Sequence, residues 1–223
     1  MEGLSTKMKK PNILIVGASG TGKSTSLRNL DPLTTIILNT EQKQLPFKTA
    51  NKFKRQAMIS ELDAFEKFFR DGIKKEDVKV LVIESFTALC EMIMVKARKL
   101  YTGFDIFNFY NDKVMEILRL SKTANCYVIF IAHNQSEGSD AGVSWQYCKV
   151  EGQKLKGTIE KEFVITLFTV PRYDDKGNIS YEFVTGADPT RSSKAPMEML
   201  PARMLNDLAE IIKLSEEYYK GEE

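Results

Sequence analysis

The chain has 223 residues, of which 43% are hydrophobic, and its 32 Lys and Arg against 30 Asp and Glu give a formal net charge of +2. These values are ordinary for a globular protein and exclude a polycation that would bind nucleic acid through its overall charge. Three widely spaced cysteines without C-x-x-C pairing, and a single histidine, exclude a disulfide framework, a zinc framework and a His-based metal cluster.

Targeting and domain organisation follow from the apolar pattern. No apolar run approaches the length of a membrane span, and the N-terminus has no signal-peptide core, so we expect a soluble, cytoplasmic protein without membrane contact. Residues 1–11 are polar and carry three lysines, which predicts a short flexible basic arm. We expect one domain over residues 12–223.

The first predicted strand, 12–16, leads into Gly17-Ala-Ser-Gly-Thr-Gly-Lys23-Ser24, and a helix over 24–30 follows. This order and spacing match the P-loop pattern G-x-x-x-x-G-K-[ST]. Glycines let backbone N–H groups point inward around phosphates, and the helix N-terminus adds unpaired N–H groups. The sequence therefore predicts ATP bound by Gly17, Ala18, Ser19, Gly20, Thr21, Gly22, Lys23, Ser24 and Thr25, with Lys23 on the β- and γ-phosphates and Ser24 on Mg²⁺.

The rest of the chain alternates predicted strands and helices. Strands are expected at 34–38, 78–83, 126–132, 163–170 and 181–185, and helices at 61–71, 86–101, 106–123 and 204–219. The last two strands flank a glycine-containing turn and predict a hairpin. This order predicts an α/β fold: a mostly parallel sheet with helices on both faces and a late antiparallel hairpin.

Two acidic residues follow predicted strands. Glu84 ends the apolar run 80–83, which is the shape of a Walker B strand whose carboxylate supports Mg²⁺, although Asp is usual there. Glu41 follows the strand after the P-loop helix, where its carboxylate could orient an attacking water. The alternatives are solvated surface acids, and the sequence leaves open whether Glu41 or Glu84 activates the water.

His133 directly follows the apolar strand 126–132. At that edge of the sheet an imidazole can bind the γ-phosphate and report its presence to the following segment, although a structural role is the alternative. Residues 134–157 are polar and glycine-punctuated, and we expect them to form a functional loop.

The order of these motifs resembles that of RecA-like ATPases: the P-loop, Glu41, Ile83-Glu84-Ser85 and Phe130-Ile-Ala-His133. The chain is most similar to the compact, phage-encoded RecA-like proteins that consist of an ATPase core, some of which act in single-strand annealing or recombination. Two later segments, 151–157 and 194–201, also resemble that group. The resemblance implies a RecA-like, Mg²⁺-dependent ATPase that acts on single-stranded DNA in phage recombination, annealing or replication. It further implies a homo-oligomeric ring or filament in the host bacterial cytoplasm.

The resemblance also implies roles for individual residues. Glu41 takes the place of the water-activating glutamate, Glu84 that of the Mg²⁺-side acid and His133 that of the γ-phosphate sensor. Arg191 and Lys194 resemble the basic residues that reach the γ-phosphate of a neighbouring subunit, with two solvated surface cations as the alternative.

Two segments are candidates for nucleic-acid contact. Residues 134–157, which correspond to the DNA-contacting loop of recombinases, place aromatics among lysines, as suits base stacking with phosphate contact but equally a subunit interface: Trp145, Tyr147, Lys149, Lys154 and Lys156. The loop 42–55 contains five cations and no acid, which makes it the cleaner electrostatic candidate. Two other functions stay open: a nucleotide-gated oligomeric binding protein without a DNA role, and a small-molecule phosphotransferase.

Overall fold

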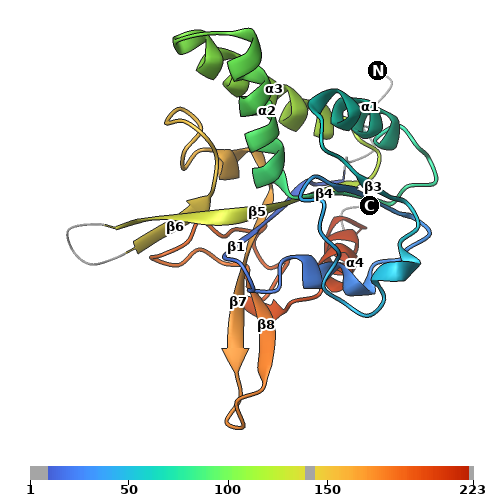
Figure 1. The fold of residues 1–223 in the computed structure, drawn as a ribbon. Coiled ribbons are helices and arrows are strands. Elements are labelled where there is room, and N and C mark those ends of the chain that lie inside the picture. The colour runs from blue at the N-terminus through green and yellow to red at the C-terminus, as the bar shows by residue number, and fades with distance from the viewer. Residues whose placement is uncertain (1–9, 139–143, 221–223) are drawn as a thin grey trace, which may run out of the picture.

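The core of the molecule is a mixed sheet with the strand order β3-β2-β4-β5-β1-β7-β8-β9, to which β6 is joined through β5 (Figure 1). The computed structural model describes residues 10–138 and 144–220, so residues 1–9 of the expected basic arm lie outside the described residues. The strands are β1 (Ile13–Gly17), β2 (Thr35–Asn39), β3 (Gln56–Met58), β4 (Val80–Glu84), β5 (Tyr127–Gly138), β6 (Ser144–Cys148), β7 (Ile165–Tyr173), β8 (Ile179–Val184) and β9 (Arg203–Leu205). Every pair from β3 to β7 is parallel, whereas β7-β8, β8-β9 and β5-β6 are antiparallel.

Helices cover both faces of the sheet (Figure 1). They are α1 (Leu62–Gly72), α2 (Phe86–Leu100), α3 (Phe104–Ser121) and α4 (Leu208–Lys220), with 3-10 helices η1 (Ser24–Asn29), η2 (Ala50–Lys52) and η3 (Ile159–Glu162). The expected α/β fold, with its mostly parallel sheet and late hairpin, is confirmed. None of the helices in the described part of the chain has both the length and the apolar character needed to cross a membrane.

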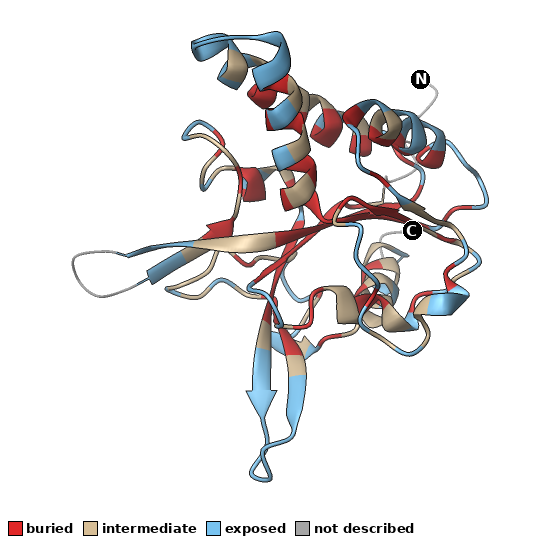
Figure 2. Cartoon of the chain, in the orientation of Figure 1, coloured by how far each residue is buried: buried red, intermediate tan, exposed pale blue. Residues whose placement is uncertain are grey.

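Alternate residues of the central strands point to opposite faces of the sheet. Leu14 and Val16 pack with the buried residues of α1, α2 and α3, whereas Ile13 and Ile15 pack with Leu27 of η1 and with α4. Both faces of the sheet are therefore buried, which explains why these strands are continuous apolar runs and do not alternate apolar with polar residues. Figure 2 shows the buried residues along the sheet and the exposed ones on the outer parts of β5, β6, β7 and β8.

The register of the strands decides what meets at the edge where β1 ends. Gly17 pairs with His133 on β5, and Glu84 pairs with Ile131 on the same strand. Asn39, two residues before Glu41, pairs with Glu84. Because parallel strands end at one edge, this register brings the P-loop, His133, Glu84 and the end of β2 together.

Three details of the predicted secondary structure are wrong. Strand β5 does not end before His133 but continues to Gly138 and pairs with β6, so much of the expected loop 134–157 is a hairpin. The strands of this hairpin are joined by residues 139–143, which lie outside the described residues. The short edge strand β3 was not expected, and the last helix begins at Leu208 because residues 203–205 form β9.

Candidate active site

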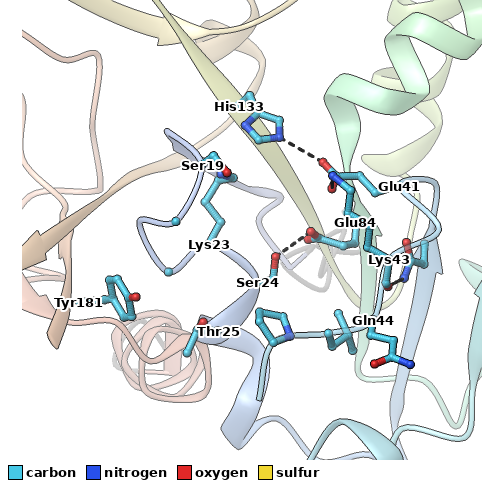
Figure 3. A pocket seen from close by; sticks show the side chains of 15 residues that line it. Ser19, Lys23, Ser24, Thr25, Glu41, Lys43, Gln44, Glu84, His133 and Tyr181 are labelled. Atoms are coloured by element: carbon cyan, nitrogen blue, oxygen red, sulfur yellow. Dashed lines mark hydrogen bonds and ion pairs between the residues drawn. The ribbon is translucent and has the colours of Figure 1, made fainter. Parts of the chain in front are cut away.

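A cavity of about 430 Å³ lies where the carboxyl ends of β1, β2, β4 and β5 meet (Figure 3). It is lined by Ser19, Gly20, Gly22, Lys23, Ser24, Thr25, Asn39, Glu41, Lys43, Gln44, Leu45, Pro46, Glu84, His133 and Tyr181. Figure 3 shows the acidic residues on one side of this cavity and Tyr181 on the other.

The glycine-rich turn after β1 is held in one shape by its neighbours. Gly22 has a φ of +92°, and a Cβ atom built on it would lie 2.5 Å from Cγ of Tyr181 on β8, so only glycine fits there. Thr21 Oγ1 lies 2.6 Å from Thr169 Oγ1 on β7 and donates to the Ala18 carbonyl at 2.8 Å. The turn is therefore anchored to the late hairpin before any ligand binds.

Lys23 and the Ser24–Glu84 pair form the centre of the cavity. Lys23 is 7% exposed, and its Nζ donates to the Ala18 carbonyl at 2.8 Å. Burial lowers the pKa of Lys23, and the charges of Glu84 and Glu41 partly oppose that shift. Ser24 Oγ donates to Glu84 Oε1 at 2.8 Å.

Glu84 is 6% exposed, and its Oε2 is buried with no hydrogen-bond partner in the described part of the chain. Burial, with a smaller contribution from the charge of Glu41, raises the pKa of Glu84 to about 7 against the hydrogen bond from Ser24. Carboxylate and hydroxyl oxygens are the ligands that Mg²⁺ prefers, and a cation there would supply the partner that Oε2 lacks. Ser24 and Glu84, together with the glycine turn and Lys23, therefore fit a Mg²⁺-bound nucleoside triphosphate.

Glu41 is held from two sides. Its Oε1 lies 3.1 Å from His133 Nε2, and its Oε2 lies 3.1 Å from Lys43 Nζ. Burial alone would raise the pKa of Glu41, but hydrogen bonds from Lys43, His133 and Ser85 outweigh it and hold the pKa below its ordinary value. Glu41 is therefore an ionised acceptor at neutral pH.

The backbone of His133 joins the cavity to two other elements. Its N–H donates to Thr87 Oγ1 on α2 at 2.9 Å, and its carbonyl accepts from the N–H of Lys149, directly after β6, at 2.8 Å. His133 therefore lies where the β5-β6 hairpin, α2 and the cavity meet.

Family comparison agrees with this arrangement. A model of the AAA domain family matches residues 9–191, a range that contains every residue lining the cavity. The chain belongs to the AAA domain family. This membership indicates a nucleotide-binding ATPase domain of the P-loop class. Among curated proteins, a search finds no match to the chain.

The residues predicted in the P-loop, together with Glu41, Glu84 and His133, fall into two groups. Those that line the cavity are Ser19, Gly20, Gly22, Lys23, Ser24, Thr25, Glu41, Glu84 and His133. Gly17, Ala18 and Thr21 belong to the same turn but do not line the cavity. The residues of the first group lie around one cavity, whereas the role of each residue stays a prediction.

The predicted nucleic-acid residues are dispersed over the β5-β6 hairpin and the segment after it. Trp145 on β6 is 41% exposed, but Tyr147 is 2% exposed, and its ring lies beneath Lys156 with Nζ 5.7 Å from the centroid. Burial therefore removes Tyr147 as a base-stacking residue, which corrects that prediction. Lys156 pairs with Glu137 at 3.0 Å and Lys149 with Glu91 at 3.7 Å, while Lys154 is exposed.

Arg191 and Lys194 do not line the cavity of their own chain. Arg191 Nη1 lies 2.7 Å from Asp188 Oδ2, and the backbone of Lys194 pairs with Thr166 of β7. The N–H of Gln146 donates to the Thr190 carbonyl at 2.7 Å, so this segment is docked on β6.

Sequence reasoning missed several residues of the cavity wall, among them Lys43, Pro46 and Tyr181. The position of Lys43, two residues after Glu41, is a signal that could have placed it in the site. Tyr181 had no local signal, because the register of the β7-β8 hairpin sets which side chain reaches the P-loop.

Proposed function

We propose that this AAA domain is a Mg²⁺-dependent ATPase in which Lys23 binds the β- and γ-phosphates and Glu41 orients the attacking water. The observation that carries the proposal is one cavity that holds the buried Lys23, the Ser24–Glu84 pair and the ionised Glu41. Bound Mg²⁺ would neutralise phosphate charge as it builds up on the leaving group.

The residues of the chain divide the work by their environments. The glycine turn offers its N–H groups to phosphate oxygens, and its contacts with Thr169 and Tyr181 fix that shape in advance. Glu84 lies beside Ser24 and has one buried oxygen that no described residue contacts by a hydrogen bond, so it is suited to the metal side of the site. Glu41 has a lowered pKa, so it is a weak base and acts mainly by orienting water through an ionised oxygen.

The experiment is ATP binding and turnover in the wild-type protein and in Lys23→Ala, with Lys67→Ala on the exposed face of α1 as the matched charge control. Lys23→Ala should lose ATP binding and keep its fold, because the ammonium compensates phosphate charge and supports no part of the apolar core. Lys67→Ala should behave as wild type. Unchanged ATP affinity in Lys23→Ala would refute the P-loop assignment.

A second proposal concerns what the ATPase acts on. We infer that the domain is of the compact phage RecA-like kind, forms a homo-oligomer and binds single-stranded DNA. The motif order given above supports this, and one structural observation favours it. The exposed Trp145 lies on β6, which pairs with the part of β5 beyond His133, so the predicted γ-phosphate sensor and an exposed aromatic belong to one pair of strands.

A further inference from the structure

Glu41 has no oxygen free of a cationic or polar partner in this structure. Oε1 faces His133, Oε2 faces Lys43, and the side chain of Ser85 adds a further hydrogen bond. A carboxylate that orients a water must accept a hydrogen bond from that water. At Oε2 the water therefore competes with the ammonium group of Lys43.

Lys43 approaches Glu41 from the solvent side. Its side chain is 76% exposed against 17% for that of Glu41, so solvent screens the ammonium end of the pair and weakens it. Its backbone is anchored separately, since the Lys43 carbonyl accepts from Asn39 Nδ2 at 2.7 Å. Lys43 also lines a second cavity of about 490 Å³ on the α2 side, which it shares with Glu41 and His133. The side chain can therefore move while the loop stays attached.

The loop that carries Lys43 is basic on its outer side. Lys48, Lys52 and Lys54 are exposed, and none of them has an acidic partner within 4.0 Å among residues 10–138 and 144–220. The apolar residues Leu45 and Phe53 of this loop are buried in the core, so they cannot insert into a lipid surface. Cations without exposed apolar anchors fit a phosphodiester backbone better than a membrane.

We propose that Lys43 restrains Glu41 in a resting position, and that a nucleic-acid strand bound to Lys48, Lys52 and Lys54 releases it by attracting the Lys43 ammonium. Lys43 is then a positioning residue for the hydrolysis step, and loop 42–55 is the surface through which a polyanion controls that step. The inference rests on the proposed ATPase function.

The first test compares unstimulated ATP hydrolysis in wild type, Lys43→Gln and Lys43→Arg. Lys43→Gln removes the restraining charge, so kcat should rise about two- to fivefold, the scale of one solvent-screened ion pair, while KM for ATP stays the same. Lys43→Arg keeps the charge and should restore the wild-type rate. A kcat for Lys43→Gln at or below wild type would overturn the restraint.

The second test adds a single-stranded thymidine oligonucleotide. It should stimulate wild type, leave Lys43→Gln unstimulated, and fail to stimulate the triple variant Lys48→Ala/Lys52→Ala/Lys54→Ala. The matched triple Lys67→Ala/Lys99→Ala/Lys176→Ala removes as many exposed charges elsewhere and should keep the stimulation. Equal stimulation of both triples, stimulation by phosphatidylserine vesicles in place of the oligonucleotide, or no stimulation of wild type would each overturn the release by nucleic acid.

Failure of this inference differs from failure of the proposed function. If wild type hydrolyses no ATP under any of these conditions, the ATPase proposal is wrong and the role of Lys43 falls with it. If wild type turns over and Lys43→Gln is no faster, only the restraint is wrong.

Discussion

At the scale of single residues, the Glu84 carboxylate is a group whose ionised form costs the protein stability. It is buried beside Ser24, one of its oxygens has no hydrogen-bond partner among residues 10–138 and 144–220, and burial raises its pKa from 4.5 to about 7. A shift of that size corresponds to roughly 3 kcal/mol of destabilisation when the group is ionised. In the nucleotide-free protein, the ionised Glu84 carboxylate therefore destabilises the fold at the position where a cation is expected.

Glu84→Gln should stabilise the protein in EDTA and without nucleotide. The folded pKa lies above the unfolded one, so wild-type stability falls as pH rises from about 4.5 to about 7, and the advantage of the variant opens over that window. Above pH 7 thermal unfolding should show a Tm higher by roughly 6–12 °C.

The control is Glu41→Gln, because the pKa of Glu41 is shifted the opposite way, below its ordinary value. The ionised Glu41 contributes stability that is lost as pH falls through its lowered pKa, so removing its charge should not stabilise the protein at neutral pH. A Tm of Glu84→Gln that equals wild type at every pH would contradict the burial of an ionised carboxylate.

At the scale of elements, the sequence predicts best where both faces of a strand are buried. The strands β1 and β4 are continuous apolar runs. Because β1, β2 and β4 run parallel, the P-loop lysine Lys23 after β1, Glu41 after β2 and Glu84 at the end of β4 line one cavity. The sequence did not predict the outer half of β5, because an exposed two-stranded ribbon has no face in the core and therefore no apolar pattern. Its stability comes from cross-strand hydrogen bonds that no local pattern reveals.

Trp145 should report on single-stranded DNA if the hairpin binds it. Trp145 is the single tryptophan of the chain. Its fluorescence should change when an oligonucleotide is added with a non-hydrolysable ATP analogue, and should change less with ADP. Base stacking is worth about 1–3 kcal/mol, so Trp145→Ala should weaken binding roughly 5–150-fold. Tyr147→Phe is the control: the ring is buried and stays in place, and the change removes the hydroxyl with its contacts to Glu137, at 3.4 Å, and to Lys156, so affinity should change far less than in Trp145→Ala. Unaltered Trp145 emission in all nucleotide states would leave the DNA role without its hairpin site.

At the scale of the whole molecule, the match to the AAA domain covers residues 9–191 and stops at Arg191. Arg191 and Lys194 lie outside the cavity of their own chain, as cations that act on a neighbour would. In this structure Arg191 is paired with Asp188, so a role in a neighbouring site requires it to exchange that partner for phosphate.

We expect these two cations to act between subunits. Specific ATPase activity should rise with protein concentration, because a cation against the γ-phosphate is worth about 10³–10⁵ in rate. Mixing Arg191→Ala/Lys194→Ala with Lys23→Ala should restore part of the activity, since each variant supplies what the other lacks. Turnover that is independent of concentration, together with no restoration on mixing, would count against a shared site.

The measurement that tests the central claim most directly is single-turnover hydrolysis of pre-bound Mg²⁺-ATP by Glu41→Gln. The amide keeps the shape of the side chain and loses the charge that orients water, so ATP affinity should stay at the wild-type value. The rate of hydrolysis should fall by about 10²–10⁴-fold, the scale of a positioned base. A Glu41→Gln rate near wild type, with Glu84→Gln inactive although it binds Mg²⁺-ATP, would contradict the account and give the water-activating role to Glu84.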